Sequence, residues 1–246
     1  MKLADLKTLL IDTVEAPPDQ PEAQVLAEWF GPVLATLPDI QPGLSCVAAS
    51  HPDCAARALQ ADAVILTGSA RDADSMEPAI LQLCGTLRAL AGKNTPVLGI
   101  CFGHQILARA LGGAVGRNPR GWEVGQVAIG LTEEGLACPL FAGFGPQPVV
   151  LQSHQDAVLA LPPGALRLAG NPHTPVQAFQ SRPGGWQYGV QFHPEFTPER
   201  LRRNWSERRI TLRGTTGFDL DAALDAAQAT PHTAALFRNF FDRIPG

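Results

Sequence analysis

Two patterns of apolar residues alternate along the first hundred positions. Short runs rich in β-branched side chains predict buried strands, and stretches with apolar residues every three or four positions predict helices. The expected strands are Thr8–Val14, Leu44–Ala49, Ala63–Thr67 and Pro96–Ile100. A loop rich in proline and acidic residues, Glu15–Glu22, follows the first strand, and the expected helices are Ala23–Leu37, Asp53–Gln60 and Met76–Ala91. This order predicts a doubly wound α/β fold with right-handed crossovers.

The pattern changes from Ala114 onward. Short apolar runs separated by Gly and Pro predict strands that extend the sheet and close over its carboxyl edge. They are expected at Val124–Leu131, Pro148–Gln152, Arg167–Ala169, Val176–Gln180 and Tyr188–Phe192. Helical spacing returns at Pro198–Ser206, Asp219–Ala229 and Thr233–Phe241. Because no linker separates these parts, we expect a single domain over residues 1–246, with a core of about 1–196 and a helical C-terminal extension over 197–246.

Composition and charge narrow the class of protein. The chain has 246 residues, of which 45% are hydrophobic and 17% charged, as in an ordinary globular protein. A net charge of −4 gives no reason to expect nucleic-acid binding. The longest apolar runs are strand-sized, and Met1–Val14 is interrupted by charges, so we expect neither a membrane span nor a signal peptide. The chain has five cysteines, and they lack the regular spacing of a disulfide framework. We therefore expect free thiols in a cytoplasmic protein.

One segment joins a buried strand to a helix through a cysteine. Residues 99–105 read Gly-Ile-Cys-Phe-Gly-His-Gln, and an Ala/Leu-rich helix, Ile106–Leu111, follows. A nucleophile flanked by glycines at a strand-to-helix turn is the arrangement called the nucleophile elbow. The start of the helix stabilises a thiolate, and the N–H of Phe102 can donate to a developing oxyanion. Cys101 is therefore the candidate nucleophile, and His104 is expected to pack or cap at the start of the helix.

The other four cysteines have no such setting. Cys46, Cys54, Cys84 and Cys138 lie in apolar or proline-adjacent stretches, which is typical of buried structural thiols. No pair of them has the spacing of zinc ligands, so we expect no metal site and no cofactor.

A histidine and a glutamate near the end of the strand region complete the candidate chemistry. His193-Pro194-Glu195 follows the expected strand Tyr188–Phe192. Because proline restricts the backbone between them, the carboxylate of Glu195 can turn back to one ring nitrogen and leave the other for a thiol proton. An isolated His-Pro-Glu is more often a surface or core feature. Together with the elbow, it predicts a base, His193, and its orienting acid, Glu195.

These motifs resemble those of the class I glutamine amidotransferases. Residues 96–113 (PVLGICFGHQILARALGG) and 190–196 (VQFHPEF) are similar to that family, especially to free-standing members resembling the glutaminase half of GMP synthetase. The resemblance covers roughly residues 63–196. It implies a flavodoxin-like three-layer α/β/α fold. It also implies attack of Cys101 on the γ-carboxamide of glutamine, release of ammonia, and hydrolysis of a γ-glutamyl thioester.

The resemblance also implies further site residues. Gly68 matches the second oxyanion donor, and Gln105 matches a glutamine that contacts the substrate. The segment that holds the amino-acid end of glutamine corresponds to Ser153, His154, Gln155 and Asp156. Without the resemblance, that segment reads equally well as a polar turn between strands. The loop Gly68-Ser69-Ala70-Arg71 departs from the family, which usually has a proline there.

Three functions stay open. The chain can be a glutaminase that supplies ammonia to a separate synthetase subunit. It can be a γ-glutamyl peptidase that acts on γ-glutamyl peptides or conjugates with the same chemistry. It can also be a non-catalytic regulatory domain, which the intact candidate residues disfavour.

An arginine-rich stretch lies in the C-terminal part. Such a stretch is usually a solvated helix face and less often a docking patch for an acidic partner or ligand. Its members are Arg200, Arg202, Arg203, Arg208, Arg209 and Arg213.

Overall fold

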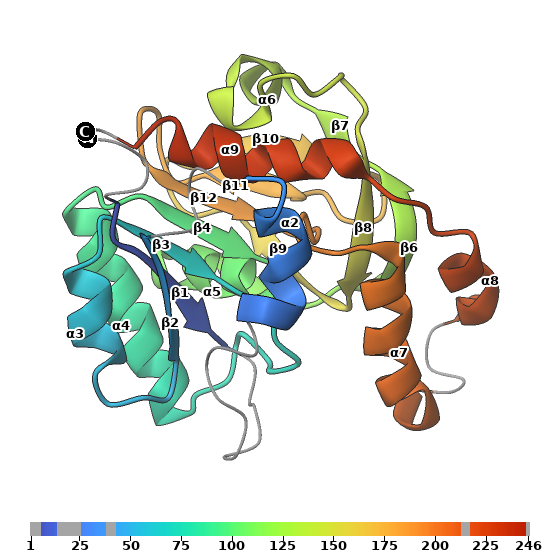
Figure 1. Cartoon of the computed structure of the whole chain (residues 1–246), viewed down its shortest axis with the longest axis horizontal. Helices are drawn as coiled ribbons and strands as arrows, with labels where there is room; N and C mark the ends of the chain where they lie inside the picture. Colours follow the sequence, from blue (N-terminus) through green and yellow to red (C-terminus); the bar gives the residue numbers. More distant parts are fainter. Residues whose placement is uncertain (1–5, 14–25, 38–42, 213–216, 245–246) are drawn as a thin grey trace.

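The computed structural model describes residues 6–13, 26–37, 43–212 and 217–244, without the side chains of residues 26, 27, 207–212 and 231. Its centre is an eight-stranded sheet in the order β2-β1-β3-β4-β12-β11-β10-β7 (Figure 1). Five neighbouring strands run parallel: β2 (Leu44–Ala48), β1 (Thr8–Asp12), β3 (Ala63–Leu66), β4 (Val97–Ile100) and β12 (Gln187–Val190). Three strands continue the sheet with antiparallel pairing: β11 (Ala178–Gln180), β10 (Leu166–Gly170) and β7 (Gly130–Leu131).

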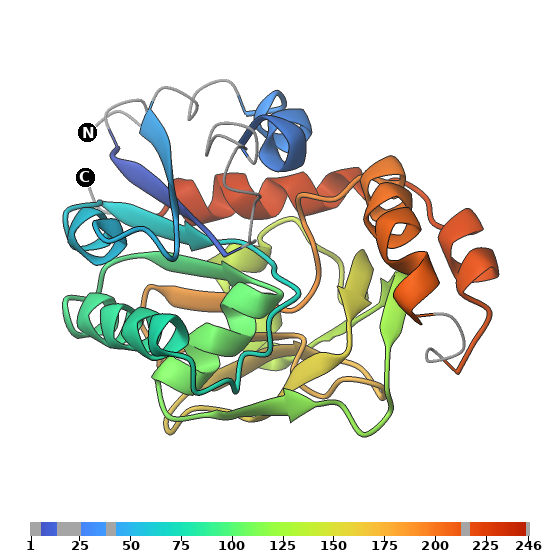
Figure 2. The same ribbon diagram turned by 90° about the horizontal axis from the view of Figure 1, so that it is seen from below.

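Helices cover both faces of this sheet, because its buried strands alternate their side chains between two apolar clusters. Leu10 packs with α2 (Gly31–Leu34) and α9 (Ala235–Phe241). Leu9 and Ile11 face the opposite cluster. That second cluster includes side chains of α3 (Cys54–Leu59), α4 (Pro78–Gly92) and α5 (Phe102–Ala110). Figure 2 shows α9 on one side of the sheet and α4 and α5 on the other. The predicted flavodoxin-like three-layer α/β/α fold is confirmed.

The first predicted helix differs in form from the expectation. In place of a continuous helix over Ala23–Leu37, a π-helical turn (η2, Leu26–Phe30) leads into the short α2. Its beginning, residues 23–25, and the expected loop Glu15–Glu22 lie outside the described residues. Pro32 near the start of α2 cannot donate a backbone hydrogen bond, which is consistent with a new helical segment beginning there.

The expected strand Val124–Leu131 is wrong as a single element. The segment forms two strands, β6 (Glu123–Ala128) and β7, which belong to different sheets. β6 pairs with β8 (Val149–His154), whereas β7 pairs with β10. A continuous apolar run does not reveal a change of pairing partner. β5 (Ala114–Arg117), β9 (Asp156–Ala160) and α6 (Glu133–Ala137) were not predicted.

The predicted C-terminal helical part is present. It consists of α7 (Pro198–Leu212), α8 (Leu220–Asp225), η5 (Pro231–Ala234) and α9. Leu201 and Trp205 of α7 pack with Val124 and Leu151 of the β6–β8 pair and with Leu224 of α8. α9 then returns to the central sheet (Figure 1). No helix in these described segments is both long and apolar enough to cross a membrane.

Candidate active site

The candidate catalytic side chains meet at the carboxyl end of three adjacent parallel strands. Gly68 lies just beyond β3, Cys101 directly follows β4, and His193 lies just beyond β12. The backbone N–H of Cys101 donates to the carbonyl of Val190 (2.9 Å), and that of His193 donates to the carbonyl of Leu151 (3.0 Å). Parallel pairing therefore gathers residues that are far apart in the sequence, at the edge where open α/β sheets bind ligands.

Cys101 has the backbone conformation of a nucleophile elbow. Its φ is 51°, which costs a residue with a side chain about 1–3 kcal/mol. A Cβ at Gly99 would overlap the carbonyl oxygen of Gly103, and one at Gly103 would lie 2.7 Å from Cβ of Leu66. The two glycines therefore let α5 pack directly against β3 and β4, as the sequence predicts. The strained turn presents the sulfur at the start of α5.

His193 is held by Glu195 and by an aromatic ring. Nδ1 of His193 lies 2.7 Å from Oε1 of Glu195, and both side chains are almost fully buried. The imidazole also stacks on Phe196, with 3.9 Å between ring centroids and an interplanar angle of 11°. Glu195 thus occupies one ring nitrogen and leaves Nε2 for Cys101. The predicted contact between the histidine and the glutamate is present.

The environment of His193 favours the protonated imidazole. Burial alone lowers the pKa of His193. The negative charges of Glu195 and Cys101 and the hydrogen bonds to both outweigh burial, and they raise the pKa from 6.5 to about 10. A protonated His193 beside the sulfur can stabilise a thiolate and deliver a proton to a leaving group.

Gly68 lies directly beside this pair. A Cβ at Gly68 would lie 2.9 Å from Cε1 of His193 and 3.5 Å from Cβ of Cys101, so a larger residue would displace the imidazole. The carbonyl of Thr67 accepts from the N–H of Gly103 (3.1 Å) and from Oγ1 of Thr13 (3.0 Å). In a trans peptide the N–H points away from the carbonyl, so these bonds fix the direction of the Gly68 N–H. Oγ of Ser69 accepts from the N–H of Arg71 (3.1 Å) and shapes the loop that departs from the family.

Gln105 and the segment Ser153–Asp156 form the next part of the site. Nε2 of Gln105 donates to the carbonyl of Asp156 (2.7 Å), and the ring of His154 bonds the same carbonyl through Nδ1 (3.0 Å). Oγ of Ser153 accepts from Nε1 of Trp205 (3.0 Å). The side chains of Gln105, Ser153 and His154 therefore make hydrogen bonds within the protein. The segment is both the junction of β8 and β9 and a wall of a cavity.

A buried glutamate that the sequence did not single out anchors His154. Oε2 of Glu123 accepts from Nε2 of His154 (2.9 Å), Oγ1 of Thr174 (2.9 Å) and Nε2 of Gln177 (2.7 Å). Oε1 accepts from Nδ2 of Asn171 (2.6 Å). Burial raises the pKa of Glu123, but the hydrogen bond and attraction of His154, with the bonds from Asn171 and Thr174, lower it to about 2. The network fixes the wall that carries Ser153 and His154.

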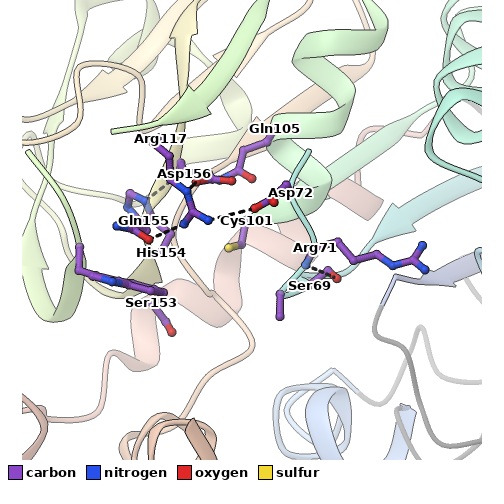
Figure 3. Close-up of a pocket in the computed structure, with 12 residues that line it drawn as sticks. Ser69, Arg71, Asp72, Cys101, Gln105, Arg117, Ser153, His154, Gln155 and Asp156 are labelled. Atoms are coloured by element: carbon purple, nitrogen blue, oxygen red, sulfur yellow. Dashed lines mark hydrogen bonds and ion pairs between the residues drawn. The ribbon is translucent and has the colours of Figure 1, made fainter. Parts of the chain in front are cut away.

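Charges of both signs line a cavity of about 290 Å³ beside Cys101 (Figure 3). Nε of Arg117 lies 3.4 Å from Oδ1 of Asp156, and its guanidinium also contacts Asp72 and Gln155. Burial raises the pKa of Asp156, and the charge of Arg117 opposes this rise. Paired acidic and basic groups suit the ammonium and carboxylate of an amino acid. Arg117 and Asp72 were missed because neither belongs to a recognisable sequence motif, and only the fold brings them together.

Arg71 and His104 lie close to Cys101 in the structure, but neither takes part in the candidate catalytic contacts. Arg71 lines the cavity, but its side chain points away from Cys101 (Figure 3) and lies 3.9 Å from Glu77. His104 is fully buried against Phe179, with ring centroids 5.1 Å apart, and burial lowers its pKa to about 3. His104 is therefore a neutral packing residue at the start of α5, as expected.

The fold and the site define a three-layer α/β/α protein with a cysteine elbow at the carboxyl edge of its sheet. The chain belongs to the class I glutamine amidotransferase family, whose sequence model matches residues 43–211. It is 45% identical over 107 residues to a GMP synthase of Parafrankia sp. (strain EAN1pec). The matched residues make up 44% of this chain and 19% of the synthase. It is 36% identical over 144 residues to γ-glutamyl peptidase 5 of Arabidopsis thaliana. Here the matched residues make up 57% of this chain and 56% of the peptidase.

A solved structure supports the same architecture over almost the whole chain. A glutamine amidotransferase from Thermotoga maritima superposes with a TM-score of 0.74 at 21% identity and covers 97% of this chain and 98% of its own. The chain thus spans a fifth to about half of the two curated relatives named above, while the fold extends across almost its full length.

Proposed function

We propose that the protein hydrolyses the side-chain amide of glutamine, or a related γ-glutamyl amide, through a γ-glutamyl thioester on Cys101. The observation that carries this proposal is the position of the sulfur, which borders both the charged cavity and the imidazole of His193. Family membership and the similarity to GMP synthases and γ-glutamyl peptidase 5 support it.

The reaction has two steps. The thiolate of Cys101 attacks the γ-carbonyl carbon, and the oxyanion is stabilised by the N–H groups of Gly68 and Phe102. The C–N bond breaks as His193 donates a proton to the departing amine. His193 then removes a proton from water, which attacks the thioester, releases glutamate and restores the thiolate. Glu195 orients the imidazole throughout.

The glutamyl part of the substrate fits the charged cavity. Asp156 or Asp72 would bind the α-ammonium, Arg117 would bind the α-carboxylate, and Gln105 with backbone groups of residues 153–156 would complete the contacts. Oδ1 of Asp156 is buried and lies 3.4 Å from Nε of the charged Arg117, but it accepts no hydrogen bond within the described structure. A bound ammonium would supply one and offset the cost of burying this carboxylate.

Two candidate functions differ in the amine that leaves the substrate. Ammonia from glutamine would serve a synthetase on another chain, whereas a larger amine would make the protein a γ-glutamyl peptidase. A second cavity on the His193 side of Cys101, of about 190 Å³, favours a larger amine.

Glutamate release from glutamine and from γ-glutamyl p-nitroanilide tests the proposal. The wild type should release glutamate from at least one of them. Cys101→Ala should abolish release, and Cys84→Ala, which removes a buried thiol of α4, should retain it. Equal rates for wild type and Cys101→Ala would refute the proposal.

A further inference from the structure

Two cavities meet at the sulfur of Cys101, and different groups line them. Gln105 and Asp156 border only the charged cavity, whereas His193 and Gly68 border only the second one. The proton for the departing amine comes from His193. The glutamyl part must therefore lie in the charged cavity, and the departing amine must lie in the second cavity.

The second cavity is larger than ammonia needs. It measures about 190 Å³, whereas a molecule the size of water occupies about 30 Å³ in the liquid. Trp29 and Phe196 form an aromatic corner of this cavity, with ring centroids 6.1 Å apart. This corner can pack against an apolar side chain.

A cation lies in the same wall. Cζ of Arg200 lies 4.2 Å from the centroid of the Trp29 ring, in cation–π geometry that orients the guanidinium. Asn204, one helical turn further along α7, also borders the cavity and donates to Oγ of Ser153 (3.3 Å). The described residues that line this cavity include no Asp or Glu. The wall therefore has hydrogen-bond donors and a positive charge. It has no described carboxylate that could bind an ammonium group on the departing part of the substrate.

We infer that the departing amine carries a carboxylate recognised by Arg200, so that γ-glutamyl amino acids with an apolar side chain are better substrates than glutamine. The inference rests on the proposed hydrolysis and specifies its substrate class. Arg200 and Asn204 would bind the carboxylate of the departing amino acid, and Trp29 and Phe196 would pack against its side chain. The γ-amide bond breaks as proposed above, and the amino acid leaves with a proton from His193.

The test uses two substrates that differ only in the carboxylate of the departing amine, with glutamine as the third. Glutamine, γ-glutamyl-phenylalanine and γ-glutamyl-phenylalanine amide are each given to the wild-type protein, and kcat/KM is measured for each. The acid should exceed its amide by about 10- to 100-fold, the range expected for a charge-assisted hydrogen bond, and should also exceed glutamine. In Arg200→Gln the ratio of acid to amide should fall towards one.

A matched control is available on the same helix. Arg203 of α7 has an exposed side chain, lies 3.6 Å from Glu28 and does not line the cavity. Arg203→Gln should keep the wild-type preference for the acid. If Arg200→Gln does not fold, Arg200→Lys, which keeps the charge, should retain part of the preference, and the wild-type substrate pair is decisive by itself.

The outcomes separate the two proposals. Hydrolysis of all three compounds by the wild type with an acid-to-amide ratio near one would overturn the role of Arg200 and leave the proposed hydrolysis standing. Failure to hydrolyse any of the three compounds would instead remove the proposed hydrolysis itself.

Discussion

His193 is restrained at Nδ1 by Glu195 and across its ring by Phe196, so its remaining nitrogen has one direction available. His193→Ala should reduce kcat about 10²–10⁴-fold, the usual contribution of a positioned acid–base group. Glu195→Gln should reduce it less, because the amide keeps the shape but not the charge. His51→Ala, at an exposed histidine, is the control. A His193→Ala rate within a few-fold of wild type in steady-state assays would exclude the triad.

Glu123 should make the stability of the protein depend on pH. Because its pKa falls from 4.5 to about 2 on folding, its ionised form contributes stability above about pH 4.5. That stability, of order 3 kcal/mol, is lost as the pH falls towards 2. Denaturant unfolding should show Glu123→Gln to be less stable at pH 7 and less sensitive to pH between 4.5 and 2. Parallel profiles of the two proteins would contradict this role.

At the residue scale, the sequence predicts the candidate catalytic residues better than the buried residues that hold the site in place. Cys101, His193 and Glu195 stand in short local motifs, and such motifs can be recognised without a fold. Glu123, Asn171 and Gln177 form a network only because β6 pairs with β8 and other segments pack beside them. Contacts between residues this far apart leave no local pattern. Arg200 was noted only as one member of an arginine-rich stretch.

The elbow depends on close packing between α5 and the sheet. In Gly103→Ala the new Cβ would lie 2.7 Å from Cβ of Leu66 and 2.7 Å from its carbonyl oxygen, and the backbone that carries this oxygen cannot move without disturbing β3. We expect a loss of about 1–3 kcal/mol of stability and a lower kcat, because Cys101 would move with the helix. Gly92→Ala is the matched control, since nothing lies within 4 Å of its Cβ position. Thermal unfolding that gave both variants the same stability would refute this packing argument.

At the element scale, prediction succeeds where an element is regular and buried. The strands β1–β4 and the helices α3 and α4 lie within two residues of the positions that the sequence predicts. β5 and β9 were missed because their patterns are mixed: β5 (Ala114–Arg117) has no buried residue, and β9 (Asp156–Ala160) buries Ala157 and Val158 but exposes its last two residues. Glycine and proline mark the turns between strands but do not say which strands pair.

The last helix belongs to the layer that covers the sheet. Phe237 and Phe240 of α9 are buried in the same cluster as Leu10, Ile65 and Val190 of the sheet. Phe240→Ala should therefore destabilise the whole molecule by about 3–5 kcal/mol, as for other buried aromatic residues. Phe218→Ala, at a partly exposed phenylalanine, is the control. If denaturant unfolding of Phe240→Ala showed loss of α9 alone with an unchanged main transition, residues 197–246 would be a separable extension.

At the scale of the whole molecule, the site is assembled by the sheet and completed by the helical part. The strands bring together Gly68, Cys101 and His193, and α7 supplies Arg200 and Asn204 to the second cavity. Helical spacing predicts that α7 exists, but not where it packs. The single-domain organisation over residues 1–246 stays a prediction.

The most direct test is to identify the nucleophilic cysteine by covalent labelling and peptide mass spectrometry. An electrophilic diazoketone analogue of glutamine should react with one of the five cysteines only, because Cys101 alone lies at a helix start beside a protonated imidazole. Stoichiometric label is expected on the peptide that contains Cys101, and none after His193→Ala or in the presence of excess substrate. Label on Cys46, Cys54, Cys84 or Cys138, or label on Cys101 that substrate does not suppress, would show that Cys101 is not the nucleophile of this site.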